Sequence, residues 1–134
     1  MKTIKTWLST IAMMLCSITA NAHDLEVGGI YYNFISDTDL TLEVTYKGNS
    51  SSDYNEYSGK VTIPSAITYK SKTYRVTSIG SSAFYGCNRL AAINIPADVT
   101  SIGESAFRDC SSLTSITLPD NVTSIRESAF EDCI

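Results

Sequence analysis

The chain has 134 residues, of which 14 are acidic and 10 basic, and its formal net charge is −4 at pH 7. It contains no cluster of lysines or arginines. The counterion-release term that dominates nucleic-acid affinity is therefore missing, and so is the attraction to an anionic membrane surface. We expect partners other than nucleic acids or membranes.

The first 22 residues have the pattern of a secretory signal peptide. Lys2 and Lys5 give a positive start, residues 7–20 are mostly apolar, and the Ala-Asn-Ala sequence at 20–22 provides the small side chains that a signal peptidase needs. We predict cleavage after residue 22 and a secreted or surface-located protein. The mature chain would be two charges more negative, because both lysines leave.

Two other interpretations of this segment stay open. A retained membrane anchor needs roughly 20 apolar residues, and the run here has about 14, with Ser and Thr inside it. Lipid attachment at Cys16 needs a small residue at the position where Leu15 stands. After signal cleavage we expect no membrane insertion.

Residues 23–59 differ from the rest of the chain and are expected to form a β-rich N-terminal cap. Two apolar segments flank Gly28-Gly29, and paired glycines supply the positive φ of a tight hairpin turn. Residues 40–46 alternate apolar and polar side chains, which is the period of a half-buried strand. The expected elements are strands at 25–27, 30–35 and 40–46, a turn at 37–39 and a surface loop at 48–53.

From residue 60 onward the chain is repetitive. Val-Thr-Ser-Ile recurs with a period of 23 residues, at 76–79, 99–102 and 122–125. Such a period is typical of a solenoid, in which no unit buries its apolar face alone and neighbouring coils share one core. The expected repeats within 60–134 are a divergent first one, complete units at 76–98 and 99–121, and an incomplete unit at 122–134.

Each complete unit contains one expected strand that ends in Ile-x-Ile/Leu-Pro, at 93–96 and 116–119. Residues 61–64 form the same strand in the divergent repeat, and the insertion after it contains a hairpin that turns at residues 70–71. Alternation points the apolar residues inward. We expect one parallel sheet, whose outer face is the candidate binding face: Thr62, Ala92, Asn94, Ser115 and Thr117.

The Ala-Phe-x-x-Cys segment of each unit is expected to form the opposite wall, as irregular or short helical segments with buried apolar side chains. The expected core columns are Phe84, Phe107 and Phe130, and Cys87, Cys110 and Cys133. Evenly spaced cysteines in an exported protein could also form a disulfide or bind a metal. Identical side-chain directions disfavour the disulfide dihedral, so we favour free, buried thiols.

The pattern Leu-x-x-Ile-x-Ile-Pro-x-x-Val-x-x-Ile-Gly-x-x-Ala-Phe-x-x-Cys resembles the 23-residue, Treponema-type leucine-rich repeats of BspA-like surface proteins. The resemblance covers residues 60–133, and the order of signal peptide, cap and repeats is similar to the N-terminal portion of such a protein. It implies a β-rich leucine-rich-repeat solenoid that is exported or attached to the surface. Some members of the family are described as adhesins.

Three departures from this pattern bear on structure. Lys70-Ser71 stands where relatives often have Asn-Gly, which weakens that turn. Arg126 replaces the glycine found at 80 and 103, and would be strained if the position needed positive φ; otherwise the glycine is only convenient. The sequence stops inside the third unit, so we expect a fragment of a longer protein that is marginally stable alone.

Catalytic groups are scarce, and we expect no enzyme activity, no cofactor and no metal. His23 is the only histidine, which leaves the repeats without a Ser-His or Cys-His pair, and no cluster has zinc-ligand spacing. Glu104 and Asp109 recur 23 residues later, as expected of a solvated wall. Tyrosines concentrated near the cap suit half-buried strands, and a carbohydrate platform is the rival interpretation.

The sequence favours an exported, non-enzymatic, adhesin-like repeat protein that binds a protein or glycan on a host or neighbouring cell. Its candidate binding face is small and neutral and lacks aromatic or arginine anchors, so many repeats would have to act together. The alternative is a repeat or targeting module of a larger secreted enzyme whose catalytic domain lies beyond Ile134.

Overall fold

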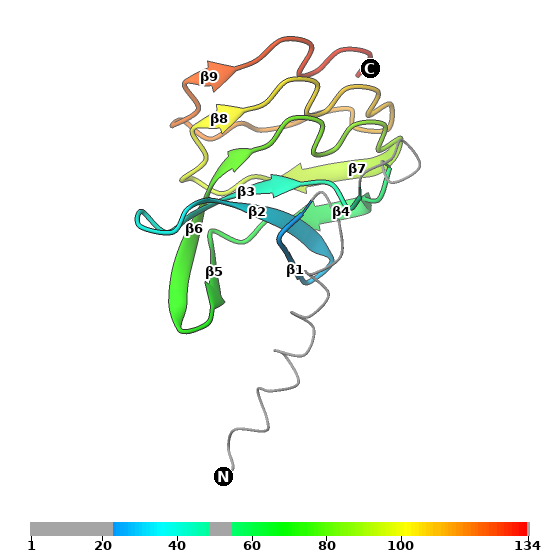
Figure 1. Ribbon diagram of the computed structural model, residues 1–134. Coiled ribbons are helices and arrows are strands. Elements are labelled where there is room, and N and C mark those ends of the chain that lie inside the picture. Colours follow the sequence, from blue (N-terminus) through cyan, green and yellow to red (C-terminus); the bar gives the residue numbers. More distant parts are fainter. Residues whose placement is uncertain (1–22, 49–54, 134) are drawn as a thin grey trace.

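Short strands and turns, stacked coil upon coil, make up the fold in the computed structural model (Figure 1). The structure describes residues 23–48 and 55–133. The predicted signal peptide and most of the predicted loop at 48–53 lie outside the described residues. The described part contains nine strands and no helix, so it has no helix that is long and apolar enough to span a membrane.

The N-terminal strands β1 (Leu25–Val27) and β2 (Ile30–Ser36) form an antiparallel hairpin. Gly28 and Gly29 form its turn with φ of 61° and 81°. Two consecutive positive φ values are the mark of the tight turn whose twist suits a hairpin, and glycine adopts them without strain. The predicted hairpin is confirmed.

Strand β3 (Thr41–Thr45) changes the sheet from antiparallel to parallel. It pairs antiparallel with β2 and parallel with β6 (Lys72–Ile79). The predicted alternation is confirmed for Leu42 and Val44, which are fully buried on either side of half-buried Glu43, but not for Thr45, which is also buried. Beyond β6 the sheet continues in parallel with β8 (Ser101–Ile102) and β9 (Ser124–Ile125).

A hairpin formed by β5 (Ala66–Tyr69) and β6 projects from this sheet, as the predicted insertion requires (Figure 1). Lys70 and Ser71 form its turn with φ of 48° and 67°, so two residues with a Cβ occupy the left-handed region. Aromatic packing compensates, because the Phe34 ring lies 5.0 Å from the ring of Tyr74.

The second sheet contains β4 (Ser58–Thr62) and β7 (Arg89–Asn94), which are parallel. Two expectations are corrected here. Residues 113–118 form no strand, although Leu113 is buried, because no backbone hydrogen bond joins them to β7 within the described residues. The parallel strands also form two ladders rather than one. The sequence did not predict the second ladder, because β8 and β9 are too short to show an alternating pattern.

The wall opposite β4 and β7 is built from turns rather than short helices. Ser82 and Gly86 have φ of 58° and 70°, and the same two positions in the later coils are also left-handed. A left-handed residue every fourth position interrupts any α-helical run. The irregular alternative of the prediction is therefore correct, and Ala83, Phe84 and Cys87 are buried as expected.

Hydrogen bonds join the coils on this turn wall as they do in a parallel ladder. Phe84 N donates to Ala106 O at 2.7 Å, and Phe107 N donates to Ala129 O at 2.8 Å. The donors two residues before and after each phenylalanine make the same bonds. In the last coil, by contrast, Phe130 N has no acceptor within the described residues.

One aromatic column runs through the core from coil to coil. The rings of Phe84 and Phe107 are 5.0 Å apart, those of Phe107 and Phe130 are 5.3 Å apart, and each pair is parallel within 2°. Tyr57 extends the column, with its ring 4.6 Å from Phe84. The predicted phenylalanine column is confirmed, and the tyrosine that begins it was not foreseen.

The cysteine column is also confirmed, with Cys87 and Cys110 buried and Cys133 half-buried, all free thiols. The thiols do more than fill space. Cys110 Sγ donates to Phe84 O at 3.1 Å, and Cys133 Sγ to Phe107 O at 2.9 Å, so each thiol bonds to the preceding coil. Burial raises the pKa of Cys110 from its ordinary 9.0 to about 12.

Gly80 and Gly103 lie where successive coils come closest. A Cβ on Gly103 would lie 2.6 Å from Ser81 N, and one on Gly80 would lie 2.9 Å from Val44 O. Neither glycine has positive φ, and neither does Arg126. Neither interpretation of this position from the sequence is therefore correct. Glycine stands at 80 and 103 because a Cβ would collide with the neighbouring coil, and not because the backbone has positive φ.

We predict that Gly103→Ala lowers the free energy of unfolding by about 1–3 kcal/mol, because its Cβ would press on backbone that cannot move aside as a flexible side chain can. Arg126→Ala is the matched control, since that position already carries a Cβ, and it should change stability by less than about 0.5 kcal/mol. Urea unfolding followed by circular dichroism measures both. Equal midpoints for the two variants would show that the coils are not in close contact at residue 103.

We predict that stability falls between pH 9 and 12, partly through Cys110. Its thiol loses its proton near pH 9.0 when unfolded and near 12 when folded. The folded state therefore holds the proton across this range, and its stabilising effect is complete below pH 9 and lost as the pH rises to 12. Urea unfolding at several pH values should show a shallower decline for Cys110→Ala. Parallel curves would contradict the prediction.

We further predict that an added coil stabilises the chain. Ile125 is 50% exposed, whereas Ile79 and Ile102 at the same position are 0% exposed. Copies of residues 111–121 and then 99–121, fused after Cys133, keep the period of 23 and would bury Ile125 and Phe130, each contributing about 1.5–3 kcal/mol. The denaturation midpoint should rise clearly. The control has Asp for Phe in the added coil, and an equal rise with it would refute stacking as the cause.

Candidate functional site

The candidate binding face lies on the β4–β7 sheet. The strand register places Thr62 beside Asn94, and both side chains are exposed, whereas Ala92 is half-buried. Ser115 and Thr117 are exposed in the next coil, outside any strand. The five positions therefore form a largely polar and uncharged surface, and their role in binding stays a prediction.

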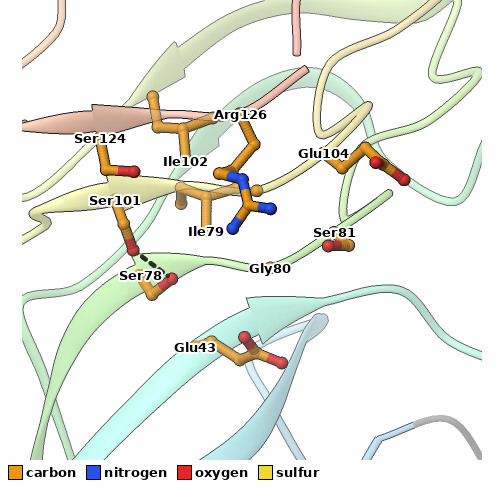
Figure 2. Close-up of a pocket in the computed structure, with 11 residues that line it drawn as sticks. Glu43, Ser78, Ile79, Gly80, Ser81, Ser101, Ile102, Glu104, Ser124 and Arg126 are labelled. Atoms are coloured by element: carbon orange, nitrogen blue, oxygen red, sulfur yellow. Dashed lines mark hydrogen bonds between the residues drawn. The ribbon is translucent and has the colours of Figure 1, made fainter. Parts of the chain in front are cut away.

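A separate groove of about 260 Å³ crosses the other ladder, over β3, β6, β8 and β9 (Figure 2). We call it the serine groove. Two rows of residues line the groove. The first row is Glu43, Ser78, Ser101 and Ser124, and the second row is Gly80, Gly103 and Arg126. Ser81 and Glu104 flank the groove. None of the five predicted face residues belongs to it.

The serine row follows directly from the parallel register. Glu43 pairs with Ser78, Ser78 with Ser101, and Ser101 with Ser124, so the four side chains occupy the same position in four neighbouring strands. Parallel strands repeat at about 4.8 Å, which is close enough for hydroxyls to meet. Ser78 Oγ lies 2.9 Å from Ser101 Oγ, and either hydroxyl can donate.

The second row makes the hollow. Gly80 and Gly103 have no side chains to fill the space beside the serines, and Arg126 stands at the same position in the last coil. Figure 2 shows the Arg126 guanidinium lying between the serine row and Glu104. The close coil contacts that require glycine therefore also leave the groove open.

The groove carries both signs of charge. Glu43 Oε1 accepts a hydrogen bond from Asn33 Nδ2 at 3.3 Å. Arg126 makes no ion pair within the described part of the chain, unlike Arg108, whose Nη1 lies 3.2 Å from Glu131 Oε1. The groove thus offers two carboxylates that only accept hydrogen bonds, a guanidinium that only donates them, and hydroxyls that do both.

The tyrosines serve the core rather than a sugar platform. Tyr31, Tyr32, Tyr57 and Tyr74 are each no more than 9% exposed. The Tyr57 hydroxyl donates to Thr45 O at 2.7 Å and accepts from Tyr31 N at 3.1 Å, which ties the aromatic column to β2 and β3. The rival interpretation of these four rings is therefore wrong.

Sequence reasoning missed the serine groove, although part of its signal was visible. The recurring Thr-Ser-Ile contains the serines, and the exchange of glycine for arginine at 126 was evident. The position of Glu43 was not, because only the parallel pairing of β3 with β6 brings it into the serine row.

Comparison with known proteins supports the repeat assignment. The family model described as BspA type Leucine rich repeat region matches residues 77–134. A solved leucine-rich repeat protein from Bacteroides ovatus is 39% identical with a TM-score of 0.62, over 75% of this chain and 24% of that one. A T. pallidum leucine-rich repeat protein is 29% identical with a TM-score of 0.64, over 81% of this chain and 45% of that one.

A solved leucine-rich cell surface protein from Faecalibacterium prausnitzii is 32% identical with a TM-score of 0.57, over 75% of this chain and 26% of that one. The chain thus spans less than half the length of each of these three relatives. No curated protein matches the sequence. Residues 77–134, with their 23-residue repeat and stacked coils, are thus a BspA-type leucine-rich repeat region, and the chain is similar to these solved leucine-rich repeat proteins.

Proposed function

We propose that this protein is an exported, non-enzymatic binding protein that attaches to a protein or glycan on a host or neighbouring cell. Residues 1–22 act as the signal peptide, 23–59 cap the solenoid, and the repeats of 60–134 carry the binding surface. The similarity to a cell surface protein of Faecalibacterium prausnitzii supports the location.

The observation that carries the proposal is the regular display of exposed side chains. Because each coil repeats the last, residues at one position of the repeat form a column on the surface, as Thr62 and Asn94 do on β4 and β7. A column of this kind presents short, uncharged polar side chains at a constant spacing, which suits an extended partner.

Binding through this face should be weak for a single molecule and strong for many. The face lacks the aromatic and arginine side chains that dominate most interfaces, so few residues can act as hot spots. When many copies are displayed on one surface, the second and later contacts become effectively intramolecular, and avidity can exceed single-site affinity by factors of about 10²–10⁴. Display on a cell surface provides that condition.

The test uses beads coated with the purified protein and monolayers of epithelial cells or immobilised matrix proteins. We predict that the beads adhere, and that Asn94→Lys reduces adhesion about fivefold or more, because it replaces a short polar side chain beside Thr62 with a long charged one. Thr73→Lys is the matched control, as it replaces another exposed strand residue far from this face in the β5–β6 hairpin.

Two results would overturn the proposal. One is adhesion no greater than that of beads coated with an unrelated protein. The other is an equal loss with Asn94→Lys and Thr73→Lys, which would mean that the added charge, not the face, governs adhesion.

A further inference from the structure

We propose that the serine groove binds a neutral sugar unit of a glycan. This inference rests on the proposed binding function and adds a second surface to it, on the other ladder from the candidate binding face. It follows from three properties of the groove: its size, the state of its backbone groups and the hydrogen-bonding character of its lining.

The size of the groove favours a small, compact unit. Its volume of about 260 Å³ lies just below the range of roughly 300–1,000 Å³ that is usual for small-molecule sites. A folded domain or a bulky side-chain cluster does not fit such a hollow, whereas one sugar ring of a longer glycan does. The rest of the glycan would lie outside, over the exposed coils.

The backbone state disfavours a peptide strand. Gly80 N donates to Val44 O, Gly103 N to Ile79 O, and Arg126 N to Ile102 O, each at 2.8–3.0 Å. An extended peptide binds a sheet mainly through unpaired backbone groups at an open edge. The floor of the groove is the face of a sheet in which these three N–H groups are already paired, so recognition over them depends on side chains.

The lining matches a neutral polyol. Glu43 and Glu104 only accept hydrogen bonds, Arg126 only donates them, and the serines do both, so the complementary group must itself both donate and accept. A sugar hydroxyl does this, and two vicinal hydroxyls can accept from the planar guanidinium together. An anion would be attracted by Arg126 but repelled by the carboxylates, and a cation would meet the reverse.

The serine row has hydrogen-bonding positions that no group in the described part of the chain uses. Ser78 and Ser101 share one hydrogen bond, and each hydroxyl has one donor and two acceptor positions. Ser124 has no recorded side-chain bond within the described residues. Glu43 keeps its second oxygen free of recorded partners, since only Oε1 accepts from Asn33. A bound sugar would therefore complete bonds rather than break them.

The experiment is a nuclear magnetic resonance titration of the ¹⁵N-labelled protein with methyl glycosides of glucose, galactose, mannose and N-acetylglucosamine. We expect at least one sugar to shift the amide signals of Ser101 and Gly103 while leaving that of Asn94 unchanged. Arg126→Ala should weaken this binding about tenfold, and Arg126→Lys should weaken it less, because lysine keeps the charge but not the planar fork. Arg89→Ala, which removes an equal charge on β7, should have no effect.

The proposal is overturned if no neutral sugar shifts the groove signals. It is also overturned if glucuronic acid binds more tightly than the neutral sugars in a way that rises as salt is lowered, which would make the groove an anion site. Bead adhesion separates this inference from the proposed function. Beads that adhere while the groove ignores sugars refute only the groove, whereas a groove that binds sugar on beads that do not adhere refutes only the cell attachment.

Discussion

The equal spacing of successive coils on both walls is the constraint on which the structure depends. On the strand wall Gly103 N donates to Ile79 O at 2.8 Å, and on the turn wall Phe84 N donates to Ala106 O at 2.7 Å. Because both walls are held to the same rise, the core between them must also repeat at that rise. The nearly parallel phenylalanine rings at 5.0 and 5.3 Å meet this requirement, and it explains why the same residue types recur every 23 positions.

The first coil meets the same requirement with a sequence that does not repeat. Val44 O accepts from Gly80 N at 2.8 Å, as Ile79 O does from Gly103 N one coil later. Tyr57 packs against Phe84 with a tilted ring and donates its hydroxyl to Thr45 O on β3, so it takes the place of a phenylalanine and satisfies its own polar group. Strand β3 and Tyr57 therefore give the repeats a surface on which to stack.

The surface chemistry follows from the same spacing and from the places where repetition breaks. Identical coils produce rows of one residue type, as in the serines of the groove. A row of serines alone carries no charge and offers only hydroxyl groups. Glu43 at one end comes from a strand outside the repeats, and Arg126 at the other replaces a glycine, so these two exceptions add charged groups to the one that Glu104 of the repeats supplies. In a repeat protein of this kind, specific recognition is therefore expected where a column changes residue type.

The sequence by itself determined the period, the buried columns, the two hairpins and the family of the repeats, because each of these rests on residue types that recur or on turn residues with few alternatives. The recurring Ala-Phe-x-x-Cys predicted buried side chains, and Gly28-Gly29 predicted a tight turn. Tertiary structure decided the second parallel ladder, the reason for glycine at 103 and the position of Glu43 beside the serines. These depend on how closely two coils approach and on which distant strand pairs with which, and neither distance nor partner is encoded in the local pattern of a two-residue strand.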